Sequence, residues 1–205
     1  MTEDEARIWL QNYCDVSRET WDQLDAFLAY LSEEMQHQNL ISKASADHIW
    51  ARHVVDSAQL LSHAPAKGSG KIWLDLGTGA GFPGMIIAIL SDYHVEMVES
   101  RNRRIAFLES AVSKLGIANK AKIWGARLEQ VSTHPVDVIS ARAFAPLQKL
   151  LSLSHRFSTE KTVWLLPKGK NAVKELKGLS PKRQKMFHVE QSLTDPDAGI
   201  LVGLD

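Results

Sequence analysis

Apolar residues in the first third of the chain recur at every third or fourth position. The apolar residues of this pattern fall in three stretches, residues 8–10, 21–35 and 46–63. It collects the apolar side chains on one face of a helix, so each stretch is predicted to be helical. Ser17 stands where it can cap the second helix. The pattern predicts a helical extension over residues 1–66 that packs on the rest of the protein.

The segment Ala-Pro-Ala-Lys-Gly-Ser-Gly, residues 64–70, has the composition of a linker. Beyond it, short apolar runs alternate with helical stretches. The runs read KIWLDL, HVEMVE, KAKIW, VDVISA and TVWLLP, and the helical stretches are residues 84–91, 102–115, 146–156 and 171–176. Strands joined by crossovers of this length run parallel, with right-handed connections. Residues 67–205 are therefore predicted to form a doubly wound α/β domain with a mostly parallel sheet.

Two further apolar runs, QKMFHVEQ and GILVGLD, stand near the C-terminus. They are predicted to form an antiparallel pair of strands at one edge of the sheet. In an open α/β sheet a ligand lies across the carboxyl ends of the strands. The loop after the first strand is therefore the expected place for a cofactor.

That loop reads WLDLGTGAGFPG. Its GxGxxG spacing, formed by Gly79, Gly81 and Gly84, is typical of a dinucleotide phosphate cradle. Its DxGxGxG spacing, which starts at Asp75 and Gly77, indicates instead a loop that holds S-adenosylmethionine (SAM). The two interpretations lead to different chemistry, hydride transfer or methyl transfer.

Three residues of the loop favour methyl transfer. Pro83 lacks one of the N–H donors that a phosphate cradle uses, and Phe82 adds bulk beside it. The Asp75 carboxylate would repel a pyrophosphate, whereas it suits the cationic amino-acid end of SAM, directly or through water. The glycines then let the backbone approach an adenosine without obstruction by a Cβ. Glu99, after the next strand, can accept both ribose hydroxyls, which either cofactor would supply.

Charge is unevenly distributed, although the formal net charge is zero. Residues 1–70 hold 5 Lys and Arg against 11 Asp and Glu, whereas residues 142–185 hold 11 against 2. A basic segment of this kind can meet a polyanion such as nucleic acid, although lysines on solvated helices would give the same count. Cys14 is the one cysteine, which excludes an internal disulfide and a cysteine-cluster metal site.

Further motifs follow LDLGTGAGFPG along the chain: RNRRIAFL, GARLE, SARAFAPL and LLPKG, with NLIS and RHVVDS upstream. Together they resemble the RsmG/GidB family, the 16S rRNA 7-methylguanosine methyltransferases. The resemblance covers about residues 35–170. It implies a Rossmann-like, SAM-dependent methyltransferase fold.

The resemblance also implies which residues hold SAM. Members bind it through residues matching Gly77 and Phe82 in the loop, the pair Leu128 and Glu129 beside the adenine, and Arg142. Combined with the loop argument, the expected cofactor-binding set is Asp75, Gly77, Gly79, Gly81, Phe82, Glu99, Leu128, Glu129 and Arg142. The implied substrate is a guanine of small-subunit rRNA, either in naked 16S rRNA or in the 30S subunit.

Methylation of guanine N7 makes a simple demand on the protein. N7 carries a free lone pair at neutral pH, so in-line transfer needs no base to remove a proton. The protein must align the reacting atoms and exclude water. Arg142 follows the fourth predicted strand and is the expected catalytic residue, because an arginine there can bind guanine O6 or a phosphate.

Other cations are expected at the same edge of the sheet. Arg127 and Lys168 follow the third and fifth strands and are predicted to border the same cleft. Phosphate contacts are expected from the basic segment and from Arg101, Arg103 and Arg104.

His53 and Asp56 lie three positions apart on a helix and so share a face. They are expected to form a polar network that seats the N-terminal helices against the glycine loop. Two side chains alone do not make a metal site, and no metal is expected.

Three alternatives stay open at this point. They are a SAM-dependent methyltransferase acting on a small molecule or protein, a NAD-dependent oxidoreductase, and a protein that senses SAM without turnover. The N-terminus is acidic, and no apolar run reaches about 18 residues, so a cytoplasmic protein without a membrane partner is expected. The absence of a long exposed apolar stripe predicts a monomer.

Overall fold

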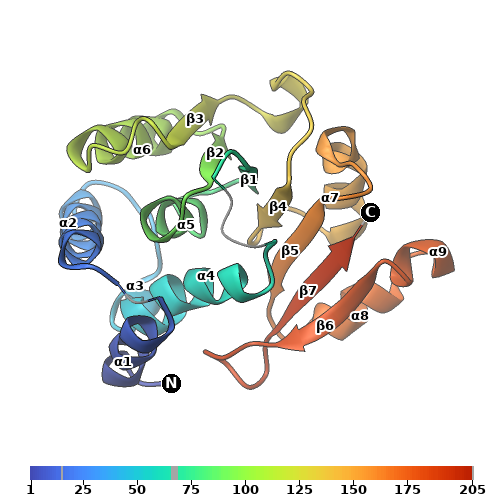
Figure 1. Ribbon diagram of the computed structural model, residues 1–205, viewed down its shortest axis with the longest axis horizontal. Coiled ribbons are helices and arrows are strands. Elements are labelled where there is room, and N and C mark those ends of the chain that lie inside the picture. Colours follow the sequence, from blue (N-terminus) through green and yellow to red (C-terminus); the bar gives the residue numbers. More distant parts are fainter. Residues whose placement is uncertain (15, 66–68, 205) are drawn as a thin grey trace.

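The computed structural model describes residues 1–14, 16–65 and 69–204. Within these ranges, seven strands form one sheet in the order β3-β2-β1-β4-β5-β7-β6. Their bounds are β1 (Ile72–Leu76), β2 (His94–Glu99), β3 (Ala121–Gly125), β4 (Val138–Ala141), β5 (Val163–Lys168), β6 (Phe187–Gln191) and β7 (Gly199–Leu204). Strands β1 to β5 pair in parallel, and β7 pairs antiparallel with β5 and β6. The predicted doubly wound sheet with an antiparallel pair at one edge is confirmed (Figure 1).

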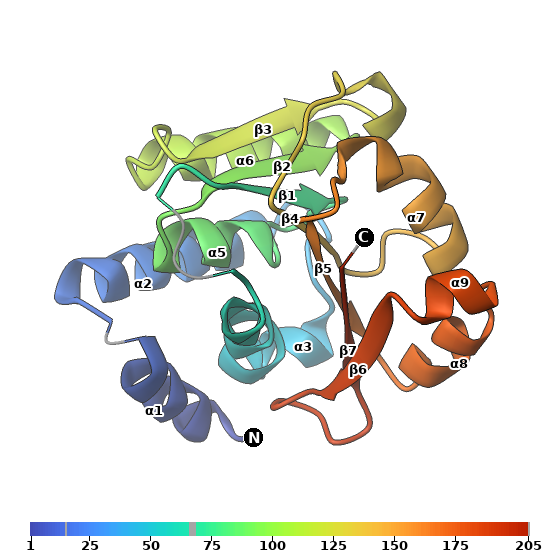
Figure 2. The ribbon, with the colours of Figure 1, turned by 45° about the vertical axis from the view of Figure 1, so that its right-hand side comes forward.

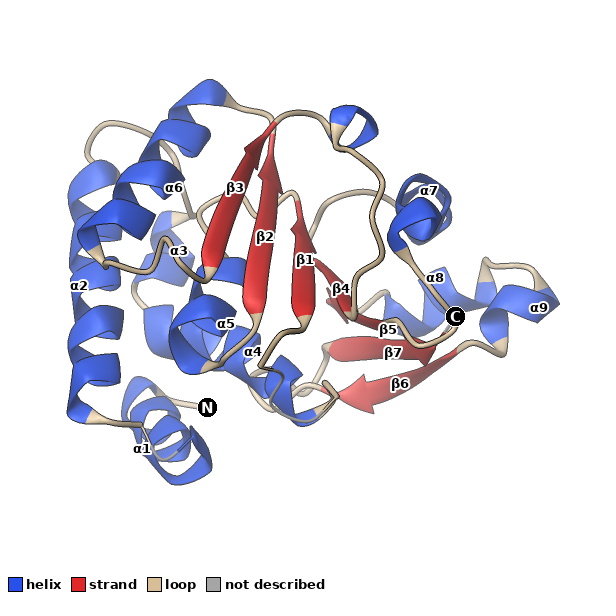
Figure 3. Ribbon diagram, turned by 45° about the horizontal axis from the view of Figure 1, so that its top comes forward, coloured by secondary structure: helices blue, strands red, loops and turns tan. Residues whose placement is uncertain are grey.

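The sheet has an apolar core on each face. Alternate residues of β1 point to opposite faces, so Trp73 belongs to one buried cluster and Leu74 to the other. The first cluster is covered by α5 (Gly84–Leu90) and α6 (Asn102–Lys114), and the second by α7 (Leu147–Ser154) and α8 (Ala172–Lys177). Burial on both faces explains why the central strands read as continuous apolar runs. Figure 3 shows the strands twisting between these helices.

The N-terminal helices add a layer to the first face. They are α1 (Glu3–Cys14), α2 (Arg18–Glu34) and the short α3 (Lys43–Ala46). The Ser17 hydroxyl accepts a hydrogen bond from the Thr20 N–H and caps α2, as its sequence position predicts. Phe27 of α2 meets the Phe82 ring edge-on at 5.7 Å and so contacts the glycine loop. Figure 2 shows α2 beside α5.

The helix expected over residues 46–63 is not regular. It begins as a π-helical segment, η1 (Trp50–Val55), continues as α4 (Asp56–Ala58) and ends as the 3-10 turn η2 (Gln59–Ser62). The π segment brings His53 and Asp56 to the same wall of a pocket. Residues 66–68 of the expected linker at 64–70, and with them the domain boundary at 66–67, lie outside the described ranges.

Three short helices complete the chain. They are η3 (Leu128–Gln130) after β3, η4 (His155–Phe157) after α7 and α9 (Pro181–Gln184) before β6. Among the described residues, none of the helices combines the length and apolar character that crossing a membrane requires.

Candidate functional site

The loop between β1 and α5 depends on its glycines. Gly77, Gly79 and Gly81 have φ values of +66°, +63° and +90°, a region that side chains with a Cβ rarely adopt. Gly77 also has no room for a Cβ, because such an atom would lie 2.6 Å from Cδ2 of Phe144. The Phe144 ring therefore rests directly on the loop backbone.

Asp75 is hydrogen-bonded within the protein. Its side chain is fully buried, and its two oxygens accept hydrogen bonds from the Gly84 N–H at 3.0 Å and from the Ser140 hydroxyl at 2.8 Å. Trp73 Nε1 donates in turn to the Ser140 hydroxyl at 2.8 Å. Burial raises the pKa of the Asp75 carboxyl group. In this geometry Asp75 ties the loop to β4 and α5.

A cavity of about 400 Å³, here called the nucleoside pocket, opens beside the loop. It brings together several of the expected residues from the ends of β1, β2 and β3, namely Gly77, Glu99, Arg101, Arg127, Leu128 and Glu129. Ala143 and Phe144, from the segment after β4, complete its far wall. The four predicted adenosine contacts among these residues, Gly77, Glu99, Leu128 and Glu129, thus share one pocket.

Glu99 is the fixed acidic group of the nucleoside pocket. Its Oε1 accepts hydrogen bonds from the N–H groups of Ser100 and Arg101 at 2.7 and 2.9 Å. Its Oε2 accepts from the Gly79 N–H at 3.1 Å and lies 3.8 Å from Arg104 Nη1. These donors hold the carboxylate in one orientation at the pocket wall. Gly79 therefore acts on the pocket through Glu99.

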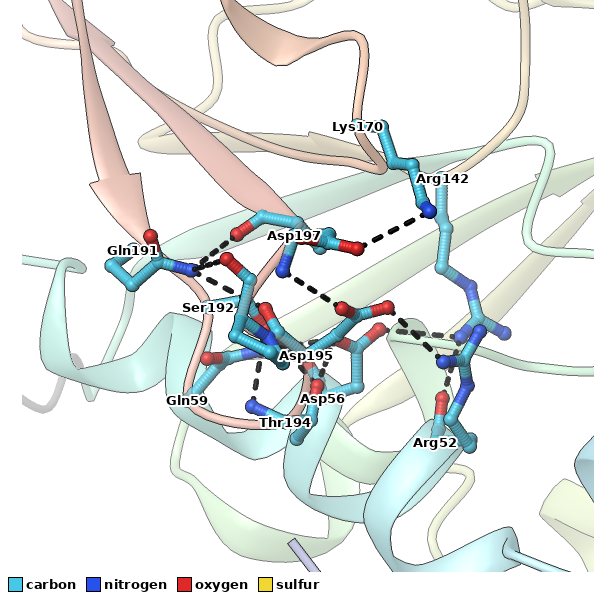
Figure 4. A network of polar contacts seen from close by, with 12 residues as sticks. Arg52, Asp56, Gln59, Arg142, Lys170, Gln191, Ser192, Thr194, Asp195 and Asp197 are labelled. Carbon is cyan, nitrogen blue, oxygen red and sulfur yellow. Dashed lines mark hydrogen bonds and ion pairs between the residues drawn. The ribbon is translucent and has the colours of Figure 1, made fainter.

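A second cavity of about 360 Å³, here called the polar pocket, lies on the other side of the segment after β4. Its wall includes Arg52, His53, Asp56, Arg142, Lys168, Thr194 and Asp195. Ala143 lines this pocket as well as the nucleoside pocket, so the two cavities meet there. Figure 4 shows Arg142, Arg52 and Asp56 around this pocket.

Arg142 organises the boundary between the two pockets. Its Nη2 donates to His53 Nδ1 at 2.9 Å, and its Nη1 lies 3.4 Å from Asp56 Oδ2. Nη1 also donates to the Arg52 carbonyl oxygen at 3.2 Å. The expected network of His53 and Asp56, which seats the N-terminal helices at the loop, is present and centres on this guanidinium.

Phe82 takes part in that network rather than in a pocket wall. Its buried ring lies 4.7 Å from the His53 ring and 5.5 Å from the Arg142 guanidinium carbon. The sequence prediction placed Phe82 against the cofactor, whereas the structure places it beneath Arg142. A ring packed under a guanidinium restricts its position.

His53 is neutral at physiological pH. An arginine has no acceptor, so Nδ1 must accept from Arg142 and the ring hydrogen must reside on Nε2. Burial, together with the charges of Arg142 and Arg52, lowers the pKa of His53 to about 3. Nε2 has no hydrogen-bond partner among the described residues. Among the residues that the structure describes, no three His, Cys, Asp or Glu side chains form a cluster that could hold a metal ion.

Two of the cations predicted to bind RNA lie away from the nucleoside pocket. The Lys168 side chain is 9% exposed and pairs with Glu175 at 3.0 Å, and Glu175 also accepts from the Leu147 N–H. Lys168 therefore ties β5 to α8 and α7, and it lines the polar pocket instead of the cleft that Arg127 borders. Arg103 is exposed and donates to the His37 carbonyl oxygen at 2.9 Å, outside both pockets.

Ala143 was not predicted as a site residue. It has φ +53° and is the one non-glycine residue with a positive φ among those described. Such strain persists where the surrounding structure enforces it, and it is common at functional sites. Here it turns the chain so that Arg142 faces one pocket and Phe144 the other. An alanine gives no sequence signal for this conformation.

Comparison with known proteins assigns the family. Residues 20–197 match the model of the GidB family, described as rRNA small subunit methyltransferase G. A relative of that name from Sphingopyxis alaskensis is 52% identical over 198 residues, which cover 97% of this chain and 84% of the relative. Another from Zymomonas mobilis is 49% identical, with 98% and 93% covered.

Solved structures resemble the fold at low sequence identity. A mutant of MtNAS in complex with S-adenosylmethionine superposes with a TM-score of 0.57 at 13% identity and covers 89% of this chain and 74% of its own. Fibrillarin in the fibrillarin/Nop5p complex gives 0.56 at 15%, with 75% and 81% covered. These likenesses bear out the Rossmann-like architecture. The chain belongs to the GidB family, rRNA small subunit methyltransferase G, and is accordingly a SAM-dependent methyltransferase.

Proposed function

We propose that this protein methylates N7 of a guanine in 16S rRNA by direct in-line transfer from SAM, without a general base. The observation that carries the proposal is the meeting of the two pockets at Ala143. One pocket is suited to an adenosine and the other is polar. A methyl group at their junction would face both.

The residues of the nucleoside pocket fit SAM. The Glu99 carboxylate, held by three backbone N–H donors, keeps acceptor capacity for a ribose hydroxyl, and Leu128 offers an apolar surface to an adenine. Gly77 leaves room for the Phe144 ring, which rests on the loop backbone and forms part of the pocket wall. Bound there, SAM supplies an electrophilic methyl group on a sulfonium. The tasks left to this chain are to orient that group and to keep water away.

The proposed reaction needs no general base, and the imidazole of the polar pocket is not available as one. His53, the imidazole nearest the junction, is neutral with a pKa of about 3 and already accepts from Arg142. Guanine N7 carries no proton, so its methylation is the reaction that such a site can perform. Arg142 is proposed as the catalytic residue, because its guanidinium can hold guanine O6, which neighbours N7.

The substrate is proposed to be rRNA, either naked or within the 30S subunit. Arg101 and Arg127 stand at the mouth of the nucleoside pocket, where they can neutralise phosphates of an RNA strand that reaches the junction. The relatives at about half identity carry the name rRNA small subunit methyltransferase G. Both pockets are formed by one chain, which supports an active monomer, and an rRNA substrate supports a cytoplasmic location.

Methyl transfer from radiolabelled SAM tests the proposal. The acceptors are 30S subunits, naked 16S rRNA and a mixed pool of small molecules and proteins, and labelled RNA is digested to nucleosides. Label recovered as 7-methylguanosine, and its loss with Arg142→Ala, would support the proposal. Label in the small-molecule or protein pool alone, with SAM binding intact, would overturn the rRNA assignment in favour of another methyl acceptor.

A further inference from the structure

We propose that the polar pocket receives the target base and that Asp56 selects guanine by accepting a hydrogen bond from its N1–H group. This inference rests on the proposed function. It assigns a ligand to the polar pocket and gives Asp56 a role beyond seating the N-terminal helices.

A donor and an acceptor lie side by side in the polar pocket, as the acceptor O6 and the donor N1–H lie side by side on the guanine edge. Arg142 is the chain neighbour of Ala143, where the two pockets meet, and its guanidinium lies 3.4 Å from the acceptor Asp56. With N7 at the junction, O6 meets the arginine and N1–H meets the carboxylate.

An adenine in the same position would be mismatched twice. Its N6 amino group would face the donor Arg142, and its unprotonated N1 would face the Asp56 carboxylate. A buried polar site rejects such an analogue strongly because its groups are left unpaired. The pair of Arg142 and Asp56 therefore discriminates between the two purines.

The Asp56 carboxylate is fixed by neighbouring side chains and can still accept a hydrogen bond. Its side chain is 19% exposed, its Oδ1 accepts from Gln59 Nε2 at 3.0 Å and from the Thr194 hydroxyl at 3.1 Å, and its Oδ2 faces Arg142. A carboxylate offers about four acceptor sites, so these three contacts leave room for a base. The fixed position distinguishes Asp56 from a solvated surface carboxylate.

The opposite wall of the polar pocket comes from the turn between β6 and β7. Asp195 of this turn pairs with Arg52 at 3.2 Å, and the Leu193 N–H donates to Gln59 Oε1 at 2.9 Å (Figure 4). Segments more than 130 residues apart in the chain are thus joined across the pocket. Three cations and two carboxylates face one cavity, which offers a base both donors and acceptors.

Nucleotide binding tests the assignment. The full-length protein, saturated with S-adenosylhomocysteine, is titrated with guanosine, inosine and adenosine 5′-monophosphates by calorimetry or ligand-observed NMR. Inosine carries the same O6 and N1–H groups as guanosine, so both are expected to bind more tightly than adenosine, whose N1 has no hydrogen. Asp56→Asn is expected to weaken guanosine monophosphate about ten-fold and to leave adenosine monophosphate unchanged. Asp47→Asn, the same change at an exposed position, serves as the control.

Equal affinity of the wild-type protein for the three nucleotides would overturn the inference, as would an Asp56→Asn variant that keeps its guanosine preference. The wild-type series does not depend on any variant, so it decides the matter even if Asp56→Asn folds poorly. Analysis of methylated nucleosides is a separate readout. Guanosine selectivity without 7-methylguanosine in RNA would support the pocket assignment and reject the proposed function, and the reverse result would do the opposite.

Discussion

Single residues set the shape of the nucleoside pocket. Gly77 has no Cβ and so allows the Phe144 ring to approach the loop. Glu99 accepts hydrogen bonds from N–H groups of two segments and so fixes them at the pocket wall. Small changes at these positions are therefore expected to weaken cofactor binding. The effect of each substitution on binding can be compared with that of the same substitution at a position with free space or solvent around the side chain.

Gly77→Ala is expected to weaken S-adenosylhomocysteine binding at least about ten-fold, because the new Cβ would press Phe144 into the pocket that it lines. Gly116→Ala is the matched control. Gly116 has the same φ of +66°, and no atom lies within 4 Å of the point that its Cβ would occupy, so this variant carries the backbone strain alone. Titration calorimetry on both variants separates the two effects. Equal affinities would refute the steric argument.

Glu99→Gln is expected to reduce S-adenosylhomocysteine affinity about ten-fold, because an amide has one acceptor oxygen and must turn its NH₂ toward backbone donors. Free adenosine should lose affinity in parallel, since the ribose is the group affected. Glu109→Gln on the exposed face of α6 provides the control. If the two variants bound S-adenosylhomocysteine with equal affinity, Glu99 would have no part in holding it.

His53 makes folding stability depend on pH. The folded pKa is about 3 against an ordinary value of 6.5, so the unfolded state binds more protons between these values. The free energy of unfolding should fall by about 1.4 kcal/mol for each pH unit below 6.5, relative to His53→Asn, whose amide oxygen can still accept from Arg142. Urea unfolding of both proteins at pH 7, 6 and 5 measures the difference. Parallel curves would show that His53 is not buried in its neutral form.

At the scale of elements, the segment from β4 to α7 connects the two pockets. The left-handed backbone at Ala143 directs Arg142 and Phe144 to different cavities. An alanine in this conformation costs about 1 kcal/mol or more. The strain is expected to have a functional reason, because a glycine would relieve it.

Ala143→Gly should therefore raise the free energy of unfolding by up to about 1 kcal/mol and slow methyl transfer several-fold, since the turn would hold Arg142 less firmly. Ala145→Gly, two residues along and without a positive φ, should instead lower stability. Chemical denaturation and single-turnover kinetics report the two quantities. A loss of stability in both variants would mean that Ala143 is not strained.

Elements could be predicted more fully than the contacts between them. Alternating apolar runs predicted the five parallel strands and the antiparallel pair, because a strand buried on both faces leaves a continuous apolar signal. The π-helical start of the segment at Trp50 left no such signal. Nor did the sequence show that β7 lies between β5 and β6, since pairing order depends on packing of the whole sheet.

Residues that belong to a motif could be grouped into a site from the sequence. The partners of buried charged residues could not be predicted in this way. Gly77, Glu99, Leu128 and Glu129 share one pocket as predicted. Asp75 and Lys168 have partners within the protein that the sequence does not reveal, Ser140 and Glu175 respectively, and Lys168 also lines the polar pocket with Arg142. A sequence lists charged residues without showing which of them are already paired.

The whole molecule places its chemistry where three parts meet. The sheet contributes the nucleoside pocket, the N-terminal helices contribute Arg52, His53 and Asp56, and the C-terminal hairpin closes the polar pocket with Thr194 and Asp195. The acidic N-terminal third and the basic segment from 142 to 185 are therefore joined at the site. This arrangement explains how a protein with zero net charge can present cations to RNA.

The most direct test of the account is the position and stoichiometry of the methyl group. Unmodified 16S rRNA, assembled into 30S subunits, is incubated with SAM that carries a ¹³C methyl group, and its nucleosides are analysed by mass spectrometry. The account predicts one labelled 7-methylguanosine per rRNA with the wild-type protein and none with Arg142→Ala. Label on an exocyclic amine or on a ribose hydroxyl would contradict it, because the account assigns the methyl group to N7.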